Sequence, residues 1–158
     1  NLMKTLKRYY NDYKLTHPTP NDIKRSAEKV SGANLDWYLL DWTQTTNTID
    51  YAVKEVAENN SKTIITLERI GRMPMPMDIL VEYTDGSKES FYIPLQMMHF
   101  VKENPNANIK RTVLKDWTWA QPTYSFPISN QSSVKKITID PSGFLADVKP
   151  ENNTLEVK

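Results

Sequence analysis

The hydrophobic period of this sequence changes once, near Ile49, and that change limits which folds the chain can adopt. Before it, apolar residues recur every three or four positions, as at Leu2 and Leu6, which is the period of an amphipathic helix. After it, apolar and polar residues alternate, which is the period of a half-buried strand. The sequence therefore predicts an α+β fold, with a short N-terminal helical segment over residues 1–47 followed by an antiparallel β-sandwich over residues 48–158.

The helical segment is divided by two breaks. Thr16–Pro20 reads THPTP, and each proline removes a backbone donor and disfavours helical geometry in the residue before it. Gly32 suits the left-handed position that commonly ends a helix. The predicted helices are a first that contains the apolar stripe from Leu2 to Tyr13 and is broken by Thr16–Pro20, a second that Asn21 or Asp22 caps, and a third that begins near Asn34 or Asp36.

Turn signals divide the rest of the chain into short segments of strand-forming residues. Asp85-Gly86 favours a tight hairpin, and the run DPSG at Asp140–Gly143 suits a type I turn. Several short strands between such turns are typical of a sandwich of antiparallel sheets. The predicted strands are Ile49–Val53, Lys62–Ile70, Met77–Tyr83, Glu89–Pro94, Arg111–Lys115, Thr123–Ile128 and Val134–Asp140.

The composition excludes several classes of protein. Twenty basic residues against nineteen acidic ones leave a net charge of +1, which lacks the concentrated positive field that nucleic-acid binding requires. The chain contains no cysteine, so a disulfide scaffold, a zinc ribbon and thiol catalysis are excluded. No apolar run approaches the ~18 residues of a membrane span. We therefore expect no nucleic-acid partner and no membrane span.

The sequence offers few groups for catalysis. His17 and His99 lie far apart and outside any H-E-x-x-H spacing, and we predict that His99 packs beside its apolar neighbours. No G-x-S-x-G nucleophile motif is present. Asp78 and Glu82 have the spacing of a strand's solvent face and do not form an acid–base pair. We therefore predict no catalytic, cofactor-binding or metal-binding residue in this chain.

Clustered aromatic residues are the strongest candidates for ligand binding. Trp117 and Trp119 would share one face of a strand, with Tyr124 close by in sequence, and flat rings of this kind can stack on a sugar or a peptide. The alternative is that the same rings fill the core of the sandwich. The methionine- and proline-rich run Met73–Met77 is interpreted as an extended entry into a strand, with its side chains packed, and not as a thioether metal site.

Two stretches together resemble a known family. The first, His17–Val53, reads HPTPNDIKRSAEKVSGANLDWYLLDWTQTTNTIDYAV and contains Ser31-Gly32 followed by acidic and aromatic residues. The second, Gly71–Leu95, reads GRMPMPMDILVEYTDGSKESFYIPL, and it is followed by WTWAQPTYSFPI and KKITIDPSGFLADVKPENN. In that order they resemble the end of the helical catalytic domain and the β-sandwich of aminopeptidase N-like zinc metallopeptidases (gluzincins), especially exported bacterial members.

The resemblance implies that the chemistry lies upstream of this chain. In the family, two histidines of H-E-x-x-H and a later glutamate hold zinc, the motif glutamate is the general base, and a tyrosine stabilises the transition state. This chain has no counterpart of the motif residues, and no local pattern identifies the tyrosine. The sequence opens at Asn1 inside an amphipathic pattern without an initiator methionine, so we expect it to be part of a longer chain.

Two hypotheses for function follow. In the first, the chain is the non-catalytic C-terminal part of an exported, zinc-dependent aminopeptidase, a hydrolase of peptides; its partners are the upstream catalytic domain and, in the whole protein, a peptide substrate. In the second, it is a stand-alone binding module that holds a sugar or a peptide on Trp117, Trp119 and Tyr124. A lineage of inactive peptidase-like scaffolds is a further alternative. In the first hypothesis, aromatic residues of the helices remain exposed because their usual partner domain is missing.

Overall fold

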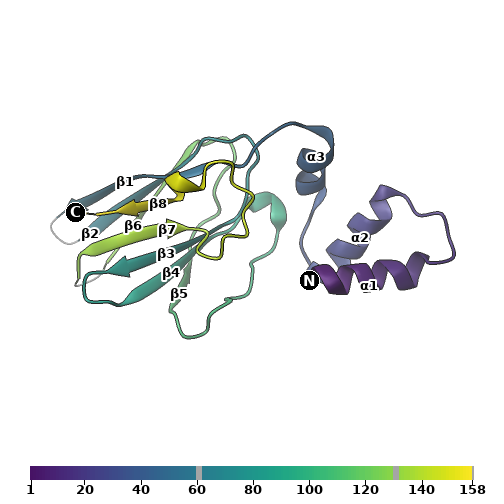
Figure 1. The fold of residues 1–158 in the computed structure, drawn as a ribbon, viewed down its shortest axis with the longest axis horizontal. Helices are drawn as coiled ribbons and strands as arrows, with labels where there is room; N and C mark the ends of the chain where they lie inside the picture. Colours follow the sequence, from purple (N-terminus) through teal and green to yellow (C-terminus); the bar gives the residue numbers. More distant parts are fainter. Residues whose placement is uncertain (60–61, 130–131, 158) are drawn as a thin grey trace. The chain divides into compact units, whose positions relative to one another are not determined.

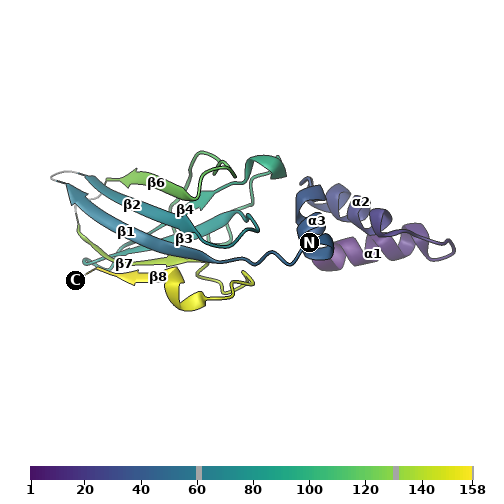
Figure 2. The same ribbon diagram turned by 90° about the horizontal axis from the view of Figure 1, so that it is seen from above.

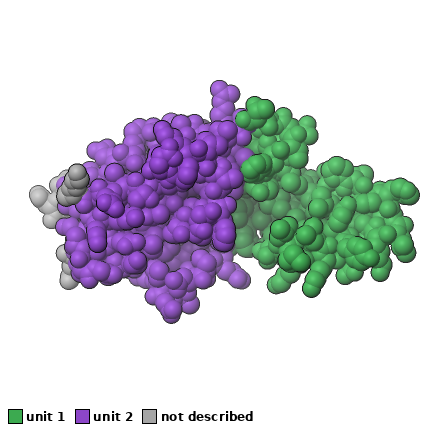
Figure 3. Space-filling model, viewed as in Figure 1, with its two compact units in different colours: residues 1–46, 97–101 green, residues 47–96, 102–158 purple. Residues whose placement is uncertain are grey.

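A computed structural model describes residues 1–59, 62–129 and 132–157, and it divides the chain into two compact units. One unit consists of residues 1–46 together with the segment 97–101, and the other of residues 47–96 and 102–158 (Figure 3). The first is helical and the second contains two mostly antiparallel sheets (Figure 1). The predicted α+β class, with helices first and a β-sandwich after them, is confirmed.

The helical unit contains α1 (Leu2–Tyr13), α2 (Pro20–Ser31) and α3 (Asp36–Gln44). The cap of α2 differs from the prediction, because Thr19 and not Asn21 or Asp22 occupies that position. Pro20 supplies the first helical residue, where its missing N–H costs nothing. The Thr19 backbone N–H and hydroxyl donate to the Asp22 carboxylate at 2.7 and 2.8 Å. These bonds from Thr19 lower the pKa of Asp22. As predicted, Gly32 ends α2 in the left-handed region, at φ 76°.

The second unit is built from a sheet of three strands and a sheet of five. The smaller sheet has the order β1-β2-β6, with β1 at Tyr51–Asn59, β2 at Lys62–Arg69 and β6 at Thr123–Ile128. The larger has the order β5-β4-β3-β7-β8, with β5 at Arg111–Val113, β4 at Lys88–Ile93, β3 at Met77–Tyr83, β7 at Val134–Ile139 and β8 at Thr154–Glu156. Figure 1 shows the two layers one above the other, and Figure 2 looks onto the smaller sheet with the larger one behind it. Short 3₁₀ turns lie at Gln96–Met98 and Pro150–Asn153.

The core of the sandwich lies between the two sheets. Alternate residues of β3 are buried along its whole length, from Met77 to Tyr83, so this face of the larger sheet points into the core. The ring of Phe91 on β4 lies 5.3 Å from that of Phe126 on β6, so side chains of both sheets meet in this layer. The completely buried large side chains are Tyr51, Ile65, Leu67, Met73, Met77, Ile79, Val81, Tyr83, Ile93, Ile137 and Ile139, together with Tyr92, which lies on the other face of the larger sheet across from Asp78.

The hairpin between β3 and β4 turns at Asp85-Gly86, as the sequence predicts. Gly86 has φ 86°, and the Tyr83 N–H donates to the carbonyl of Ser87 at 3.0 Å. The Asp85 carboxylate accepts bonds from the Ser132 hydroxyl at 2.6 Å and from the Ser87 hydroxyl and N–H at 2.6 and 2.8 Å. The bond from Ser132 and those from Ser87 lower the pKa of Asp85 to about 2. This carboxylate therefore ties the β3–β4 turn to the segment before β7.

Acid should weaken this tie. Because the folded-state pKa of Asp85 lies below the unfolded value of 3.8, its stabilisation is present above pH 3.8 and is lost as the pH falls towards about 2. We expect Asp85→Asn to lower the free energy of unfolding at pH 5. Between pH 5 and pH 2.5 this variant should lose less further stability than the natural chain does. Urea denaturation at both pH values measures this, with Glu58→Gln, at an exposed side chain of β1, as the matched control. Equal acid losses in the Asp85 variant and the natural chain would contradict the assignment.

Candidate functional site

The structure brings no metal centre together in the part of the chain that it describes. No group of three or more histidine and carboxylate side chains there is placed to hold an ion. His17 is exposed in the connection between α1 and α2. His99 is also exposed and has φ 49°, so the prediction that it packs beside its apolar neighbours is wrong. Its neighbours Met98 and Phe100 are half-buried.

The structure brings Trp117 and Tyr124 into ring contact but does not place them with Trp119 on one exposed face. Trp117 is buried, with 4% of its surface exposed, whereas Trp119 is 55% exposed. Residues 114–122 form no strand, so the two indoles do not share the face that regular alternation would give them. Tyr124, on β6, is half-buried. A flat three-ring platform for a sugar or peptide is therefore not formed.

Trp117 belongs to the packed interior of the sandwich. Its ring centroid lies 5.5 Å from that of Tyr51 and 5.3 Å from that of Tyr124. The indole N–H donates to the Gln121 carbonyl at 2.9 Å, and the backbone N–H donates to Pro94 at 3.1 Å. The Tyr124 hydroxyl also bonds inward, to the carbonyl of Lys115 at 2.8 Å, and burial raises its pKa. These polar groups bind neighbouring backbone atoms.

The methionine- and proline-rich run packs as the sequence predicts. Met73 and Met77 are each 1% exposed, and Pro74 between them is buried. The Tyr51 hydroxyl accepts the Met75 N–H at 2.8 Å, which anchors the run to β1. Burial is the main reason that the pKa of Tyr51 rises to about 12. The side chains of Met73 and Met77 are therefore packed in the interior of the fold.

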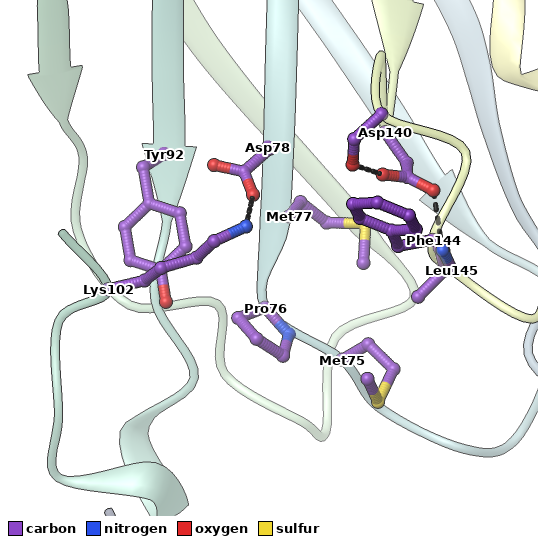
Figure 4. Close-up of a pocket in the computed structure, with 10 residues that line it drawn as sticks. Met75, Pro76, Met77, Asp78, Tyr92, Lys102, Asp140, Phe144 and Leu145 are labelled. Atoms are coloured by element: carbon purple, nitrogen blue, oxygen red, sulfur yellow. Dashed lines mark hydrogen bonds and ion pairs between the residues drawn. The ribbon is translucent and has the colours of Figure 1, made fainter. Parts of the chain in front are cut away.

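A hollow that sequence reasoning missed lies on the outer face of the larger sheet. Two adjoining cavities, of about 160 and 410 Å³, share four lining residues on β3 and on the loops after β4 and β7. We call the pair the outer groove and define it by Asp78, Leu80, Tyr92, Lys102, Ser142 and Phe144. Figure 4 shows Lys102 reaching across Tyr92 to Asp78, with Phe144 and Asp140 on the opposite wall.

Asp78 does not face open solvent, so its predicted place on a strand's solvent face is wrong. Its carboxylate binds the Lys102 ammonium at 2.6 Å and the Arg111 guanidinium at 3.2 Å, and only 17% of the Asp78 side chain is exposed. The Arg111 guanidinium also lies 4.3 Å from the centre of the Tyr92 ring, a cation–π contact. Glu82 lies four residues further along the same face of β3. It is half-buried, and its carboxylate pairs with the Lys88 ammonium at 3.4 Å. The segment 102–111 thus covers one end of this face.

Tyr92 has a buried hydroxyl that is poorly satisfied. The residue is 0% exposed, and its hydroxyl makes no hydrogen bond of normal geometry among the described residues. Burial raises the pKa of this phenol, and the nearby backbone of Lys102 opposes that rise. A buried hydroxyl without a partner is unusual, because most such groups are satisfied by protein or water. The one sequence signal for this region is Leu80, an apolar residue on the polar face of β3 between Asp78 and Glu82.

The two buried tyrosines should respond differently to loss of their hydroxyl groups. We expect Tyr51→Phe to lower the free energy of unfolding by about 1–3 kcal/mol, because the Met75 N–H loses its acceptor. Tyr92→Phe should change stability by less than about 0.5 kcal/mol or raise it, because the hydroxyl makes no hydrogen bond of normal geometry and its interaction with the Lys102 backbone is weak. Urea denaturation of both variants measures the difference. A large loss in the Tyr92 variant would show that its hydroxyl has a partner.

Comparison with known proteins gives no assignment: no family model, no curated protein and no solved structure matches this chain. In the residues described, no helix is both long enough and apolar enough to cross a membrane.

Proposed function

We propose that this chain is the non-catalytic C-terminal part of an exported, zinc-dependent aminopeptidase-like metallopeptidase. In this proposal the helices complete the wall of an upstream helical catalytic domain. The β-sandwich is attached to that wall and limits access to the active site or positions the peptide substrate. Zinc belongs to the upstream domain, since the described residues of this chain contain no cluster of ligands that fits it.

The observation that carries this proposal is that the helical unit lacks a core of its own. In residues 1–46 and 97–101, all of which are described, no large apolar side chain is buried. The buried residues of the three helices are small and polar, Thr5 and Ser26. A unit of three helices normally hides an apolar stripe from each helix. These helices are therefore suited to packing against further protein.

The exposed stripe of α1 shows which kind of partner fits. Leu2, Leu6 and Tyr10 occupy one side of the helix and are 71, 42 and 66% exposed. Trp42 on α3 adds a ring that is 50% exposed. Apolar side chains at this spacing favour another helix, because its ridges can enter the grooves between them. A helical domain of the same chain meets this requirement.

The sandwich does not need such a partner to the same degree. Both faces of its core are supplied by its own sheets, as the contact of Phe91 with Phe126 illustrates. The sandwich buries its own apolar side chains, whereas the helical unit leaves its apolar side chains exposed. This contrast supports a chain in which the helices belong to a larger helical domain and the sandwich follows it. It gives less support to a stand-alone module, in which both parts would be expected to bury their apolar surface.

The coding sequence immediately upstream of Asn1 tests the proposal. An H-E-x-x-H motif with a later glutamate in the same frame would support it. The longer protein, but not residues 1–158, should then bind one zinc ion and hydrolyse an aminoacyl p-nitroanilide. If the upstream sequence resembles a peptidase but has lost the zinc-binding residues, the protein is an inactive scaffold. If no peptidase-like sequence lies upstream, the proposal is overturned.

A second test uses the exposed stripe itself. In the longer protein, Leu6→Glu should weaken the packing of α1 and reduce peptidase activity or thermal stability by a measurable margin. Leu15→Glu, at a side chain 91% exposed in the loop after α1, is the matched control and should leave both unchanged. Equal tolerance of the two substitutions would contradict a buried role for this stripe.

A further inference from the structure

We infer that the helix of the upstream domain that packs on α1 carries a row of carboxylate side chains, which lie against Lys7 and Lys14. This inference rests on the proposed function, which supplies the helix, and it adds the chemistry by which α1 recognises that helix. The two lysines border the exposed stripe of α1, and α2 covers the opposite side of the stripe.

One side of α1 is already covered by α2. The two helices pack together, and the residues of α1 that lose exposure are Thr5, Tyr9 and Tyr13, which follow one another at four-residue steps. The rings of Tyr9 and Tyr13 also contact each other, with their centres 5.5 Å apart. The exposed stripe lies next to this row, turned from it by about 100° around the helix. A partner can therefore reach the stripe from the side away from α2.

Two lysines border the stripe on that free side. Met3 widens the stripe with a side chain that is 66% exposed, and Lys7 follows Met3 by four positions, as Lys14 follows Tyr10. Side chains four positions apart lie one turn from each other on the same side of a helix. Lys14 ends α1 with helical backbone angles, φ −53° and ψ −20°, so this spacing holds to the end of the helix. Both lysines are exposed.

The positive charge of these lysines is not matched within the described part of the chain. The one acidic residue of α1 is Asp12, and its carboxylate contacts the Arg8 guanidinium at 3.4 Å. Among the described residues, no carboxylate forms an ion pair with Lys7 or Lys14. Opposite charges across an interface select the partner and fix its register. A helix with carboxylates beside its own apolar row would complete this surface.

Two other occupants fit this face less well. A second copy of α1 would bring like charges together, because its lysines border the same stripe. A helix that lies in a lipid surface sinks its whole apolar face into the headgroup layer. Here α2, packed along one side of the stripe, would have to enter that layer with its charged residues. A single helix that approaches from the free side meets neither obstacle.

The experiment adds the chain of residues 1–158 to a fluorescein-labelled, end-blocked helical peptide and follows fluorescence anisotropy. The peptide has three heptads with leucine at a and d and glutamate at e and g, and a matched peptide has lysine at e and g. We expect the glutamate peptide to bind with a Kd below about 100 μM, and the lysine peptide about tenfold more weakly or less, at about 50 mM salt. The difference should shrink at about 0.5 M salt, because salt screens exposed charges.

Substitutions in α1 show which side chains recognise the charge. The double variant Lys7→Glu with Lys14→Glu should reverse the preference, so that the lysine peptide binds about tenfold more tightly than the glutamate peptide. Leu6→Glu should weaken the binding of both peptides about tenfold or more, because it places a charge in the stripe. The matched control is Lys115→Glu with Lys149→Glu, at two exposed lysines of the sandwich, and it should bind both peptides as the natural chain does. Circular dichroism confirms that each variant is folded.

Three results would overturn the inference: no saturation with either peptide, equal affinity for both peptides at low salt, and reversal of the preference by the control. Sedimentation of the chain with phosphatidylglycerol vesicles, abolished by Leu6→Glu, would assign this face to lipid and overturn it as well. The upstream coding sequence separates this inference from the proposed function. If H-E-x-x-H lies upstream and the chain prefers the lysine peptide, only the inference fails. If the chain prefers the glutamate peptide and no such motif lies upstream, the proposed function fails and α1 remains a docking face for an acidic helix of another protein.

Discussion

Replacing Trp117 with alanine should lower the free energy of unfolding by about 3–5 kcal/mol. The indole is 4% exposed and contacts the rings of Tyr51 and Tyr124, so its removal leaves a cavity between the sheets. The carbonyl of Gln121 also loses the indole N–H that donates to it at 2.9 Å. Urea denaturation followed by circular dichroism measures the loss.

The matched variant Trp119→Ala should cost less than about 0.5 kcal/mol, because this ring is 55% exposed. The pair of variants separates a role in packing from a role in ligand stacking. Should both variants fold with unchanged stability, and should both lose affinity for a sugar, Trp117 would belong to a binding surface and its burial in the core would be contradicted.

Gly71→Ala should cost about 3 kcal/mol or more, because backbone atoms fill the place of the new methyl group. A β-carbon at Gly71 would lie 2.3 Å from the carbonyl oxygen of Thr48 and 2.6 Å from the backbone nitrogen of Asp50. These two segments cannot separate without loss of hydrogen bonds, since the N–H groups of Ile70 and Gly71 both donate to the Asp50 carbonyl, at 2.8 and 2.9 Å. Thermal denaturation should show a midpoint several degrees lower.

Gly86→Ala provides the comparison for this variant. Gly86 has φ 86° and no heavy atom within 4 Å of its added β-carbon, so only backbone strain of about 1 kcal/mol opposes the substitution. If Gly71→Ala lowered the free energy of unfolding no more than Gly86→Ala does, the backbone around Gly71 would be able to move away from the new methyl group. The close approach of Gly71 to Thr48 would then not be needed for stability.

Much of the fold follows from local sequence. The bounds of α1 agree with the spacing of its apolar residues, and the turn at Asp85-Gly86 agrees with its dipeptide. The cap of α2 was predicted wrongly because Thr19, Asn21 and Asp22 can all cap a helix. The choice depends on Pro20, whose fixed φ suits the first helical residue and so places Thr19 before it.

The remaining features depend on contacts between residues distant in sequence. Strand β8 spans only Thr154–Glu156, which is too short to show a period of two. Strand β5 pairs with β4 in the parallel direction, and that pairing is set by the path of the loop between them. Asp78 looked solvent-facing because its partner Arg111 lies 33 residues further along the chain. Local patterns therefore identified β2, β3, β4, β6 and β7 and the start of β1, but not β8, the parallel pairing of β5 or the outer groove.

The segment 97–101 has a consequence for how this protein can be divided or inherited. The chain leaves the sandwich after Gln96, joins the helical unit, where the Met98 carbonyl accepts the Asn34 N–H at 2.9 Å, and returns at Lys102. No single continuous stretch of the gene thus encodes either unit completely. Gene fusion or recombination that moves residues 1–46 alone leaves behind residues 97–101, which belong to the same helical unit. We therefore expect the two units to be inherited together. A protease that cuts the linker near Thr46 would likewise produce two fragments, with residues 97–101 of the helical unit left on the fragment that contains the sandwich.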